Sequence, residues 1–328
     1  MTIGIIQPNI ISNDIEKNLQ HCEGLMKSLP NAANMANMPD GSGSVQVFLL
    51  PEMFATGFPA SREQAEPPLL PHGTEPPPLS ENDNGQAKIQ MWMKRMAQEL
   101  NAVVAGTVAV KEVDAAAVAA DTITAIDTTA AVDVATTIDT TAATTAASTN
   151  IAKEETIYNR LIWMRPTGEY FAYDKKHLFG AEKETYEQGT QIVTVQEQGW
   201  NFRLNVCYDL RFPIWCKNRR LYGDTLDYDI VIFPSSWPTS RINVWKTLLP
   251  ARAVENLAYS IGINRSGKDI NGTHYNGQST VSDAQGNIIT QLDEKPQAIT
   301  VTLDKRPLER LREHLTVSHD WDEYELKQ

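Results

Sequence analysis

Short apolar runs of strand length, alternating with helical segments, are the feature that most limits the fold of this chain. Strands are predicted, in chain order, at 3–8, 45–50, 102–110, 157–164, 170–179, 200–207, 228–233 and 298–303, and the one at 170–179 runs into a loop. A hairpin is predicted at 280–283 and 287–292. Helices are predicted at 14–29, 87–100, 213–222 and 251–260. Strands that alternate with helices in this order predict an α/β layered fold with one mixed sheet system.

The composition is that of an ordinary globular protein. The chain has 328 residues, of which 41% are hydrophobic and 21% charged, and we expect a single domain over residues 1–328. A net charge of −12 argues against nucleic-acid partners and anionic membrane surfaces. The opening MTIGIIQPNI has no signal-peptide pattern, and no apolar run reaches membrane-spanning length. Three cysteines, an odd and sparse count, then favour a reducing compartment, so we expect a cytoplasmic protein.

A low-complexity insertion occupies about residues 114–150. It consists almost entirely of Ala, Thr, Asp, Val and Ile, and the hexapeptide IDTTAA occurs at 126–131 and again at 138–143. It can be interpreted as an acidic interaction loop or as a neutral repeat expansion within a surface hairpin. We favour the expansion, because exposed loops tolerate long insertions at a small entropic cost.

Three chemically reactive side chains lie at or just past the ends of predicted strands. They are Glu52, Lys175 and Cys207. Because ligands in open α/β sheets bind beyond the carboxyl ends of the strands, these residues are candidates for one site. The other two thiols, Cys22 and Cys216, fall within predicted helices and are expected to be inert core residues.

Glutamate, lysine and cysteine together supply a base, a positive charge and a nucleophile. A free thiol has a pKa of about 8.5, which a neighbouring ammonium lowers. A carboxylate such as Glu52 can take the thiol proton, and Lys175 with the backbone N–H of Tyr208 can stabilise the oxyanion formed by attack on an amide. Each residue alone has a more common explanation, namely a surface glutamate, an exposed lysine and a buried inert thiol.

The segments around these residues resemble the nitrilase superfamily of carbon–nitrogen hydrolases. PEMFATGF (51–58), YDKKHLF (173–179) and VCYDLRFP (206–213) are similar to its three motif regions and occur in the expected order. The resemblance implies a four-layer α-β-β-α sandwich that assembles as a homodimer or larger homo-oligomer. It also implies hydrolysis of a small-molecule amide through a cysteine thioester, without a cofactor or metal.

The resemblance also implies which charged residues take part. The spacing of K-x-H-L-F selects Lys175 rather than Lys176, and a second glutamate seven residues before a glycine corresponds to Glu182 and Gly189. Its implied role is to position the lysine and the substrate amide. Glu184 is the competing assignment and would otherwise be a surface charge.

Within the superfamily, the chain is most similar to the omega-amidase branch, which includes 2-oxoglutaramate amidase. Such substrates carry a carboxylate remote from the amide. Arg211 is expected either to bind this carboxylate or to form a structural salt bridge, and Trp237 and Phe58 either wall the pocket or pack in the core. Alternative substrates are a nitrile, an N-carbamoyl amine or deaminated glutathione, and the alternative from another class is a non-catalytic scaffold.

Two further points concern metals and helix geometry. The cysteines are dispersed and no C-x-x-C or paired-histidine spacing occurs, so a zinc site is not expected. There is also no G-x-G-x-x-G or phosphate loop. Pro250 falls within an expected helix at 245–260, which it should kink or delay.

Overall fold

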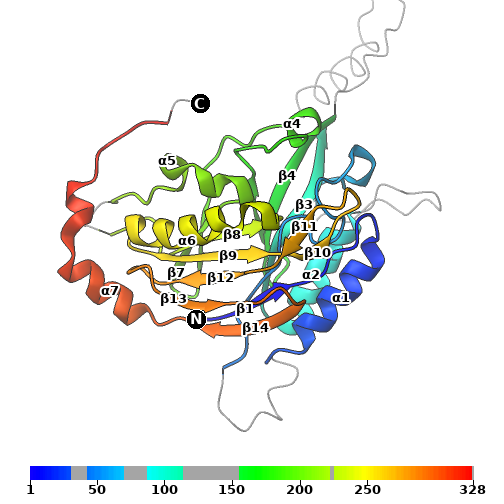
Figure 1. The fold of residues 1–328 in the computed structure, drawn as a ribbon. Helices are drawn as coiled ribbons and strands as arrows, with labels where there is room; N and C mark the ends of the chain where they lie inside the picture. The colour runs from blue at the N-terminus through cyan, green and yellow to red at the C-terminus, as the bar shows by residue number, and fades with distance from the viewer. Residues whose placement is uncertain (31–42, 70–86, 114–154, 222–224, 327–328) are drawn as a thin grey trace, which may run out of the picture.

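The computed structural model describes residues 1–30, 43–69, 87–113, 155–221 and 225–326. The expectation for the insertion at 114–150 lies outside these residues. Two six-stranded mixed sheets form the centre of the fold (Figure 1), and each has three parallel strands in its middle.

The first sheet has the order β14-β1-β2-β3-β4-β5. Its strands are β1 Thr2–Gln7, β2 Val47–Leu49, β3 Val103–Val113, β4 Glu155–Met164, β5 Tyr170–Asp174 and β14 Gln297–Thr302. The strands predicted at 102–110 and 157–164 are β3 and β4, which pair antiparallel from Val104 opposite Met164 to Val113 opposite Glu155.

The second sheet has the order β13-β12-β9-β8-β7-β6. Its strands are β6 Thr194–Glu197, β7 Trp200–Leu204, β8 Ile230–Ser235, β9 Tyr259–Asn264, β12 Thr280–Ser282 and β13 Ile288–Gln291. The short strands β10 Ser266–Lys268 and β11 His274–Asn276 form a separate antiparallel pair. The hairpin predicted at 280–283 and 287–292 is confirmed as the antiparallel pair β12–β13. Its register shifts between Val281 and Ser282.

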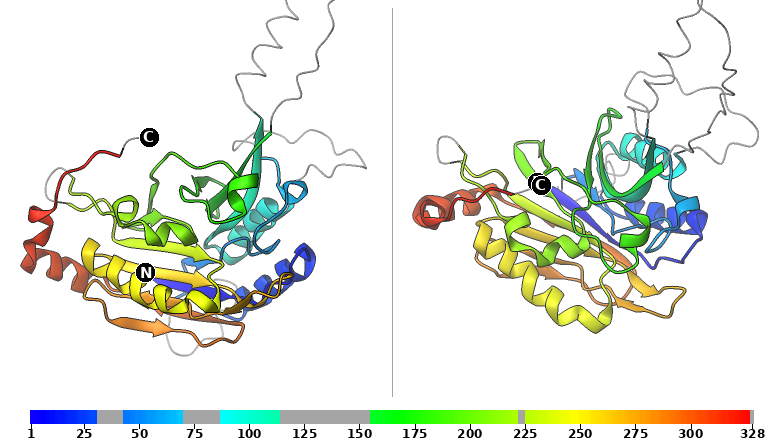
Figure 2. Two further views of the ribbon diagram at one scale, coloured as in Figure 1. Left: turned by 45° about the horizontal axis from the view of Figure 1, so that its top comes forward. Right: turned by 90° about the horizontal axis from the view of Figure 1, so that it is seen from above.

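Helices cover the outer faces of both sheets. α1 Ile15–Lys27 and α2 Lys88–Leu100 lie on the first sheet, and α6 Ile242–Asn256 lies on the second (Figures 1 and 2). The structure is therefore the four-layer α-β-β-α sandwich that the sequence resemblance implies.

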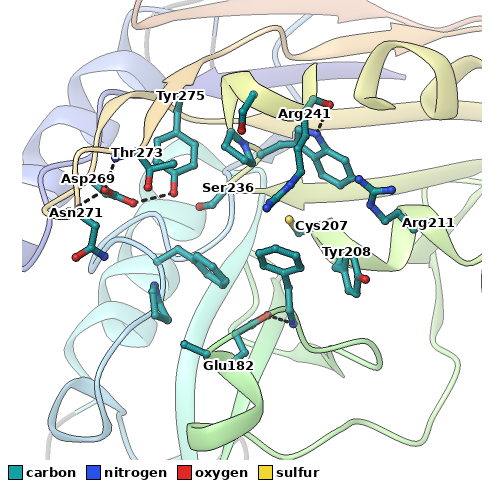
Figure 3. Close-up of a pocket in the computed structure, with 17 residues that line it drawn as sticks. Glu182, Cys207, Tyr208, Arg211, Ser236, Arg241, Asp269, Asn271, Thr273 and Tyr275 are labelled. Carbon is teal, nitrogen blue, oxygen red and sulfur yellow. Dashed lines mark hydrogen bonds between the residues drawn. The ribbon is translucent and has the colours of Figure 1, made fainter. Parts of the chain in front are cut away.

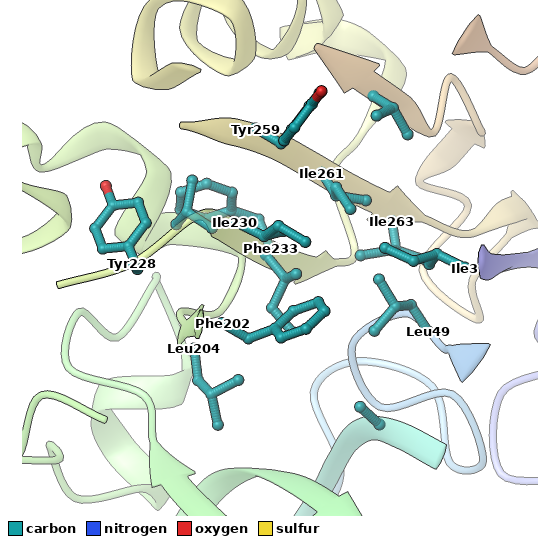
Figure 4. Packing of buried hydrophobic residues seen from close by; sticks show 14 of the residues in the cluster. Ile3, Leu49, Phe202, Leu204, Tyr228, Ile230, Phe233, Tyr259, Ile261 and Ile263 are labelled. Carbon is teal, nitrogen blue, oxygen red and sulfur yellow. The ribbon is translucent and has the colours of Figure 1, made fainter. Parts of the chain in front are cut away.

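Strand alternation distributes the apolar side chains between two interiors. In β2, Val47 and Leu49 point toward the second sheet, whereas Phe48 packs against the helices α1 and α2. The space between the sheets is filled by buried side chains from both, including Ile3, Leu49, Phe202, Leu204, Ile261 and Ile263 (Figure 4). Because both faces of the central strands are buried, these strands are continuous apolar runs in the sequence.

Several predicted boundaries were wrong. The helix predicted at 213–222 is only the four residues of α5, Pro213–Cys216, and α7 Lys305–His314 was not predicted. The helix predicted at 251–260 begins at Ile242, and Pro250 lies inside it without delaying its start. It ends because Leu257 adopts a left-handed conformation with φ 48°, after which Tyr259 begins β9.

A close contact fixes α6 on the second sheet. A Cβ atom on Gly262 of β9 would lie 2.4 Å from Trp245 Cζ2 and 2.6 Å from Leu249 Cδ1. Only glycine leaves room for the helix at this distance. Since α6 begins directly beside the segment that follows β8, this contact also helps to fix one wall of the candidate site.

Candidate active site

The three strand-end residues come from both sheets and meet in the interior. Glu52 follows β2, Lys175 follows β5, and Cys207 lies just beyond β7. The side chains of Glu52 and Lys175 are fully buried, and Cys207 is 7% exposed. Glu182, the first residue of α4 Glu182–Thr185, is also fully buried, whereas the competing Glu184 is exposed. The structure thus brings together the four residues expected from the sequence.

The buried charges form a closed ring of hydrogen bonds. Lys175 Nζ donates to Glu52 Oε1 at 2.7 Å and to Glu182 Oε2 at 2.6 Å. Asn159 Nδ2 completes the ring by donating to Glu52 Oε1 at 2.9 Å and to Glu182 Oε1 at 2.8 Å. Each carboxylate is therefore held by both a cation and an amide.

Asn159 is a component of the site that the sequence reasoning missed. It lies on β4 and is fully buried. Its backbone carbonyl oxygen accepts a hydrogen bond from the backbone N–H of Lys175 at 2.9 Å. Its side-chain Oδ1 is buried without a hydrogen-bond partner among the described residues. A signal was present, because Asn159 interrupts the apolar face that β4 directs inward at Ile157, Leu161 and Trp163.

Backbone contacts fix the orientation of Glu52. Ser236 N–H donates to Glu52 Oε2 at 2.9 Å, and Ser236 Oγ donates to the Glu52 carbonyl oxygen at 3.1 Å. Met53 has a positive φ of 48°, and its N–H donates to Thr107 Oγ1 of β3 at 2.9 Å. The glutamate is thereby held by the neighbouring strand and by the segment after β8.

Cys207 lies on a strained turn. Its φ is 43°, a conformation that is rare for residues other than glycine, and it begins the short 3₁₀ helix η3, Cys207–Arg211. The buried Asp209 stabilises this turn: its carboxylate accepts hydrogen bonds from the Val206 N–H at 2.9 Å, the Tyr173 hydroxyl at 2.7 Å and the His177 N–H at 3.0 Å. The Cys207 thiol lies close enough to the ring of charges for Glu52 and Lys175 to act on it electrostatically.

The electrostatics of the site keep the lysine charged and the thiol neutral. Burial acts to lower the pKa of Lys175, but the attraction of Glu52 and Glu182 outweighs it and raises the pKa above its usual value. Burial and then the Glu52 charge raise the pKa of Cys207 well above its usual value, although Lys175 opposes them. The net effect on the thiol is therefore opposite to the lowering expected from Lys175 alone.

Glu182 also has a shifted pKa. Burial raises it, the attraction of Lys175 opposes this rise, and the nearby Glu52 charge adds to it. Burial, reinforced by the Glu52 charge, therefore favours the protonated form of Glu182 relative to an exposed glutamate.

A pocket of about 430 Å³ opens above Cys207 (Figure 3). Its aromatic lining includes Tyr208, Trp237 and Phe58, three residues named from the sequence. Trp237 is 3% exposed, and Phe58 is partly buried with its ring centroid 5.2 Å from Lys175 Nζ. Both therefore line the pocket while also packing against neighbouring residues.

Arg211 lines the same pocket, and its side chain contacts two aromatic rings there. Its Cζ lies 5.4 Å from the Trp237 ring centroid and 6.0 Å from the Tyr208 ring centroid. No carboxylate among the described residues forms an ion pair with it, so the structural salt bridge considered from the sequence is not seen there.

The described residues offer neither a metal-binding cluster nor a membrane-spanning helix. Within these ranges, no cluster of three or more His, Cys, Asp or Glu side chains is arranged to hold a metal ion. None of the helices described above is both long and apolar enough to span a bilayer.

Comparison with known proteins agrees with this geometry. The carbon–nitrogen hydrolase family model matches residues 2–313. "Omega-amidase YafV" of Escherichia coli K12 is 30% identical over 329 residues, covering 99% of this chain and 98% of the relative. "2-oxoglutaramate amidase" of Paenarthrobacter nicotinovorans is 31% identical over 172 residues, which cover 50% of this chain and 57% of that protein.

Solved structures show the same fold. XC1258 from Xanthomonas campestris, described as a CN-hydrolase superfamily protein, superposes with a TM-score of 0.74 at 28% identity, covering 100% of this chain and 99% of the other. Saccharomyces cerevisiae Nit3, a member of branch 10 of the nitrilase superfamily, superposes with a TM-score of 0.67 at 20% identity, covering 96% and 94%. From the family match and the full-length relatives, we conclude that this chain belongs to the carbon–nitrogen hydrolase family of the nitrilase superfamily.

Proposed function

We propose that this protein hydrolyses the terminal amide of a small omega-amido acid through a thioester on Cys207, with 2-oxoglutaramate as the expected substrate. The observation that carries the proposal is the buried ring of Glu52, Lys175, Glu182 and Asn159 beside the Cys207 thiol, at the base of an open pocket. This arrangement supplies a base, a fixed positive charge and a nucleophile at the point where a substrate can enter.

The first step is attack of sulfur on the amide carbon. Because the pKa of Cys207 is raised, the resting thiol is protonated and needs a base when it attacks. The pKa of Lys175 is also raised, so the lysine stays protonated and the base is assigned to Glu52. Transfer of the proton from Cys207 to Glu52 leaves the net charge of the buried cluster unchanged.

The tetrahedral intermediate then breaks down to a thioester. The Lys175 ammonium and the backbone N–H of Tyr208 are assigned to stabilise the oxyanion. Glu52 returns its proton to the departing nitrogen, the C–N bond breaks, and ammonia leaves. Glu52 next accepts a proton from a water molecule that attacks the thioester. The C–S bond then breaks, the carboxylic acid leaves, and Glu52 returns its proton to the Cys207 sulfur, which restores the thiol.

The substrate class is supported by the pocket and by the relatives. Arg211 faces the pocket without an ion-pair partner among the described residues, and a carboxylate remote from the amide would supply one. The relatives named omega-amidase span nearly the full chain, and those named 2-oxoglutaramate amidase match about half of it. These observations favour an omega-amido acid over a nitrile or an N-carbamoyl amine.

Ammonia release tests this proposal. Purified protein should release ammonia from 2-oxoglutaramate, and Cys207→Ala should reduce the rate to background. Full activity of Cys207→Ala would disprove the mechanism. A much higher kcat/KM for a nitrile in a panel of amides, nitriles and N-carbamoyl amines would disprove the substrate. If no substrate is turned over and iodoacetamide does not modify Cys207, a non-catalytic scaffold would be the better explanation.

We also propose that the protein assembles as a homodimer or larger homo-oligomer. Apolar side chains are exposed on the outer helical layer, including Ile214 of α5, 53% exposed, and Val254 of α6, 47% exposed. Light scattering coupled to size-exclusion chromatography should give a mass of at least twice 36.5 kDa. A monomeric mass at micromolar concentration would contradict this assembly.

A further inference from the structure

A second arginine that has no ion-pair partner in the described part of the chain faces the candidate active site. Arg241 ends the 3₁₀ helix η5, Thr239–Arg241, which connects the segment after β8 to α6, and it lines the same pocket as Arg211 and Cys207. Its Cζ lies 4.6 Å from the ring centroid of Phe179. Nothing in its sequence context, PTSRINVW, distinguishes it from an ordinary surface residue.

Neither arginine has a carboxylate partner among the described residues. Their side chains contact aromatic rings, which attract a guanidinium group but supply no strong hydrogen-bond acceptor for its N–H groups. Two uncompensated guanidinium groups in one pocket also repel each other. A bound carboxylate would relieve this repulsion and accept the free N–H donors.

The backbone that carries Arg241 is held in place. Trp237 Nε1 donates to the Arg241 carbonyl oxygen at 2.9 Å, and the Arg241 N–H donates to the Pro238 carbonyl oxygen at 3.0 Å. Trp237 is itself held by Asn264, which accepts from the Trp237 N–H at 2.8 Å and donates to its carbonyl oxygen at 3.0 Å. The position of Arg241 is therefore tied to a buried residue of β9 rather than to a free loop.

The two acidic residues that line the pocket do not neutralise this pair, because Glu182 is paired with Lys175 and Asp269 is already hydrogen-bonded. Asp269 lies across the pocket from Arg211, near Asn271 and Thr273 (Figure 3). Its carboxylate already accepts hydrogen bonds from the N–H groups of Asn271 and Thr273 and from the Tyr275 hydroxyl, at 2.9, 2.8 and 3.0 Å. The pocket thus has a cationic side and a satisfied acidic side.

We propose that Arg241 is a specificity-determining residue that binds the substrate carboxylate together with Arg211, and so selects omega-amido acids over neutral amides. The inference rests on the proposed function, since it needs an amide to be hydrolysed at Cys207. It goes further by assigning a residue on a different element, η5, to recognition of the acid.

Two substrates of matched length measure this selection. Succinamate and butanamide share the reacting amide and the carbon chain, but only succinamate carries a carboxylate. Loss of a hydrogen-bonded charge contact weakens binding by roughly 10-fold or more. We therefore expect Arg241→Gln to raise the KM for succinamate at least about 10-fold, with a smaller change in kcat, and to lower the succinamate-to-butanamide ratio of kcat/KM similarly.

Two further variants serve as comparisons. Arg241→Lys should give an intermediate KM, because lysine retains the charge but loses the planar pair of donors. Arg306→Gln should behave as wild type, because Arg306 is 78% exposed on α7, pairs with Asp304 and does not line the pocket. Added salt should raise the succinamate KM more in wild type than in Arg241→Gln, because Arg241 is exposed to solvent and its attraction is screened.

The possible failures are distinguishable. If wild type hydrolyses neither 2-oxoglutaramate nor succinamate, the proposed function fails. If wild type hydrolyses succinamate and Arg241→Gln keeps the wild-type KM and salt dependence, the role of Arg241 is wrong while the proposed function stands. The role of Arg241 is also wrong, with the proposed function intact, if Arg211→Gln raises the KM for succinamate and Arg241→Gln does not.

Discussion

The side-chain amide of Asn159 lies 2.9 Å from Glu52 Oε1 and makes this hydrogen bond from within β4. The same nitrogen donates to Glu182 Oε1 at 2.8 Å. One neutral amide therefore links two buried carboxylates independently of Lys175. Without it, Lys175 would be the only side chain among the described residues that donates hydrogen bonds to both carboxylates.

Asn159→Asp should test this link, because it replaces the donor by a negatively charged acceptor of the same shape. A third carboxylate would raise the pKa of Glu182 further above its usual value. We expect kcat to fall by about 100-fold or more. The acidic limb of the pH–rate profile should move to higher pH, because the carboxylates of the cluster then take up protons at a higher pH than in wild type. A profile with an unchanged acidic limb, in a variant with a wild-type circular dichroism spectrum, would contradict the linking role.

The sequence predicted the candidate site better than it predicted the element boundaries. Glu52, Lys175 and Cys207 could be identified because apolar runs show where buried strands end, and chemistry in α/β folds gathers at strand ends. Asn159 lies in the middle of a strand, where a polar residue is usually taken as facing solvent. Its inward direction depends on the register of β4, which only the alternation with its apolar neighbours indicates.

The missed helix α7 shows why boundaries are harder to predict. Leu308 is its one buried side chain, so its apolar pattern is weak, and tertiary contacts such as the Arg312–Asp229 ion pair at 2.7 Å hold it in place. Arg241 was not predicted for a similar reason. Its importance comes from facing a pocket together with Arg211, a relationship that exists only in the folded chain.

Two glycine substitutions should have opposite effects on stability. Gly262→Ala places a Cβ 2.4 Å from Trp245 Cζ2, so we expect it to lower the free energy of unfolding by about 1–3 kcal/mol. Gly24→Ala lies within α1 with no atom within 4 Å of the new Cβ, so it should raise that free energy by about 0.5–1 kcal/mol. Urea unfolding measures both, and equal midpoints for the two variants would contradict the close α6–β9 contact.

The same substitution, made at each of the two glutamates of α4, tests which of them the site requires. Glu182→Gln removes a buried partner of the Lys175 ammonium, so we expect kcat to fall by about 100-fold or more and the melting temperature to fall as well. Glu184→Gln should change neither, because Glu184 is exposed. Comparable losses of activity in both variants would mean that α4 itself, rather than the Glu182 carboxylate, is what the site requires.

Glu52→Gln should distinguish the role of Glu52 as a base from the effect of its charge on the Cys207 thiol. The variant cannot accept the Cys207 proton during attack on an amide, so we expect kcat to fall by about 1,000-fold. Burial raises the pKa of the thiol, the Glu52 charge raises it further, and Lys175 lowers it. Removing the Glu52 charge should therefore lower the pKa of Cys207 and increase its thiolate fraction at neutral pH.

Alkylation by iodoacetamide measures that fraction, because it needs a thiolate but no proton transfer to an amide. We expect alkylation of Cys207 at neutral pH to be faster in Glu52→Gln than in wild type, although amide turnover is nearly lost. Mass spectrometry identifies the modified cysteine, with Cys207→Ala as the control, since Cys22 and Cys216 are buried and have raised pKa values. If alkylation slows in parallel with turnover, the Glu52 carboxylate does not hold the thiol in its neutral form, and the electrostatic explanation of the resting site is wrong.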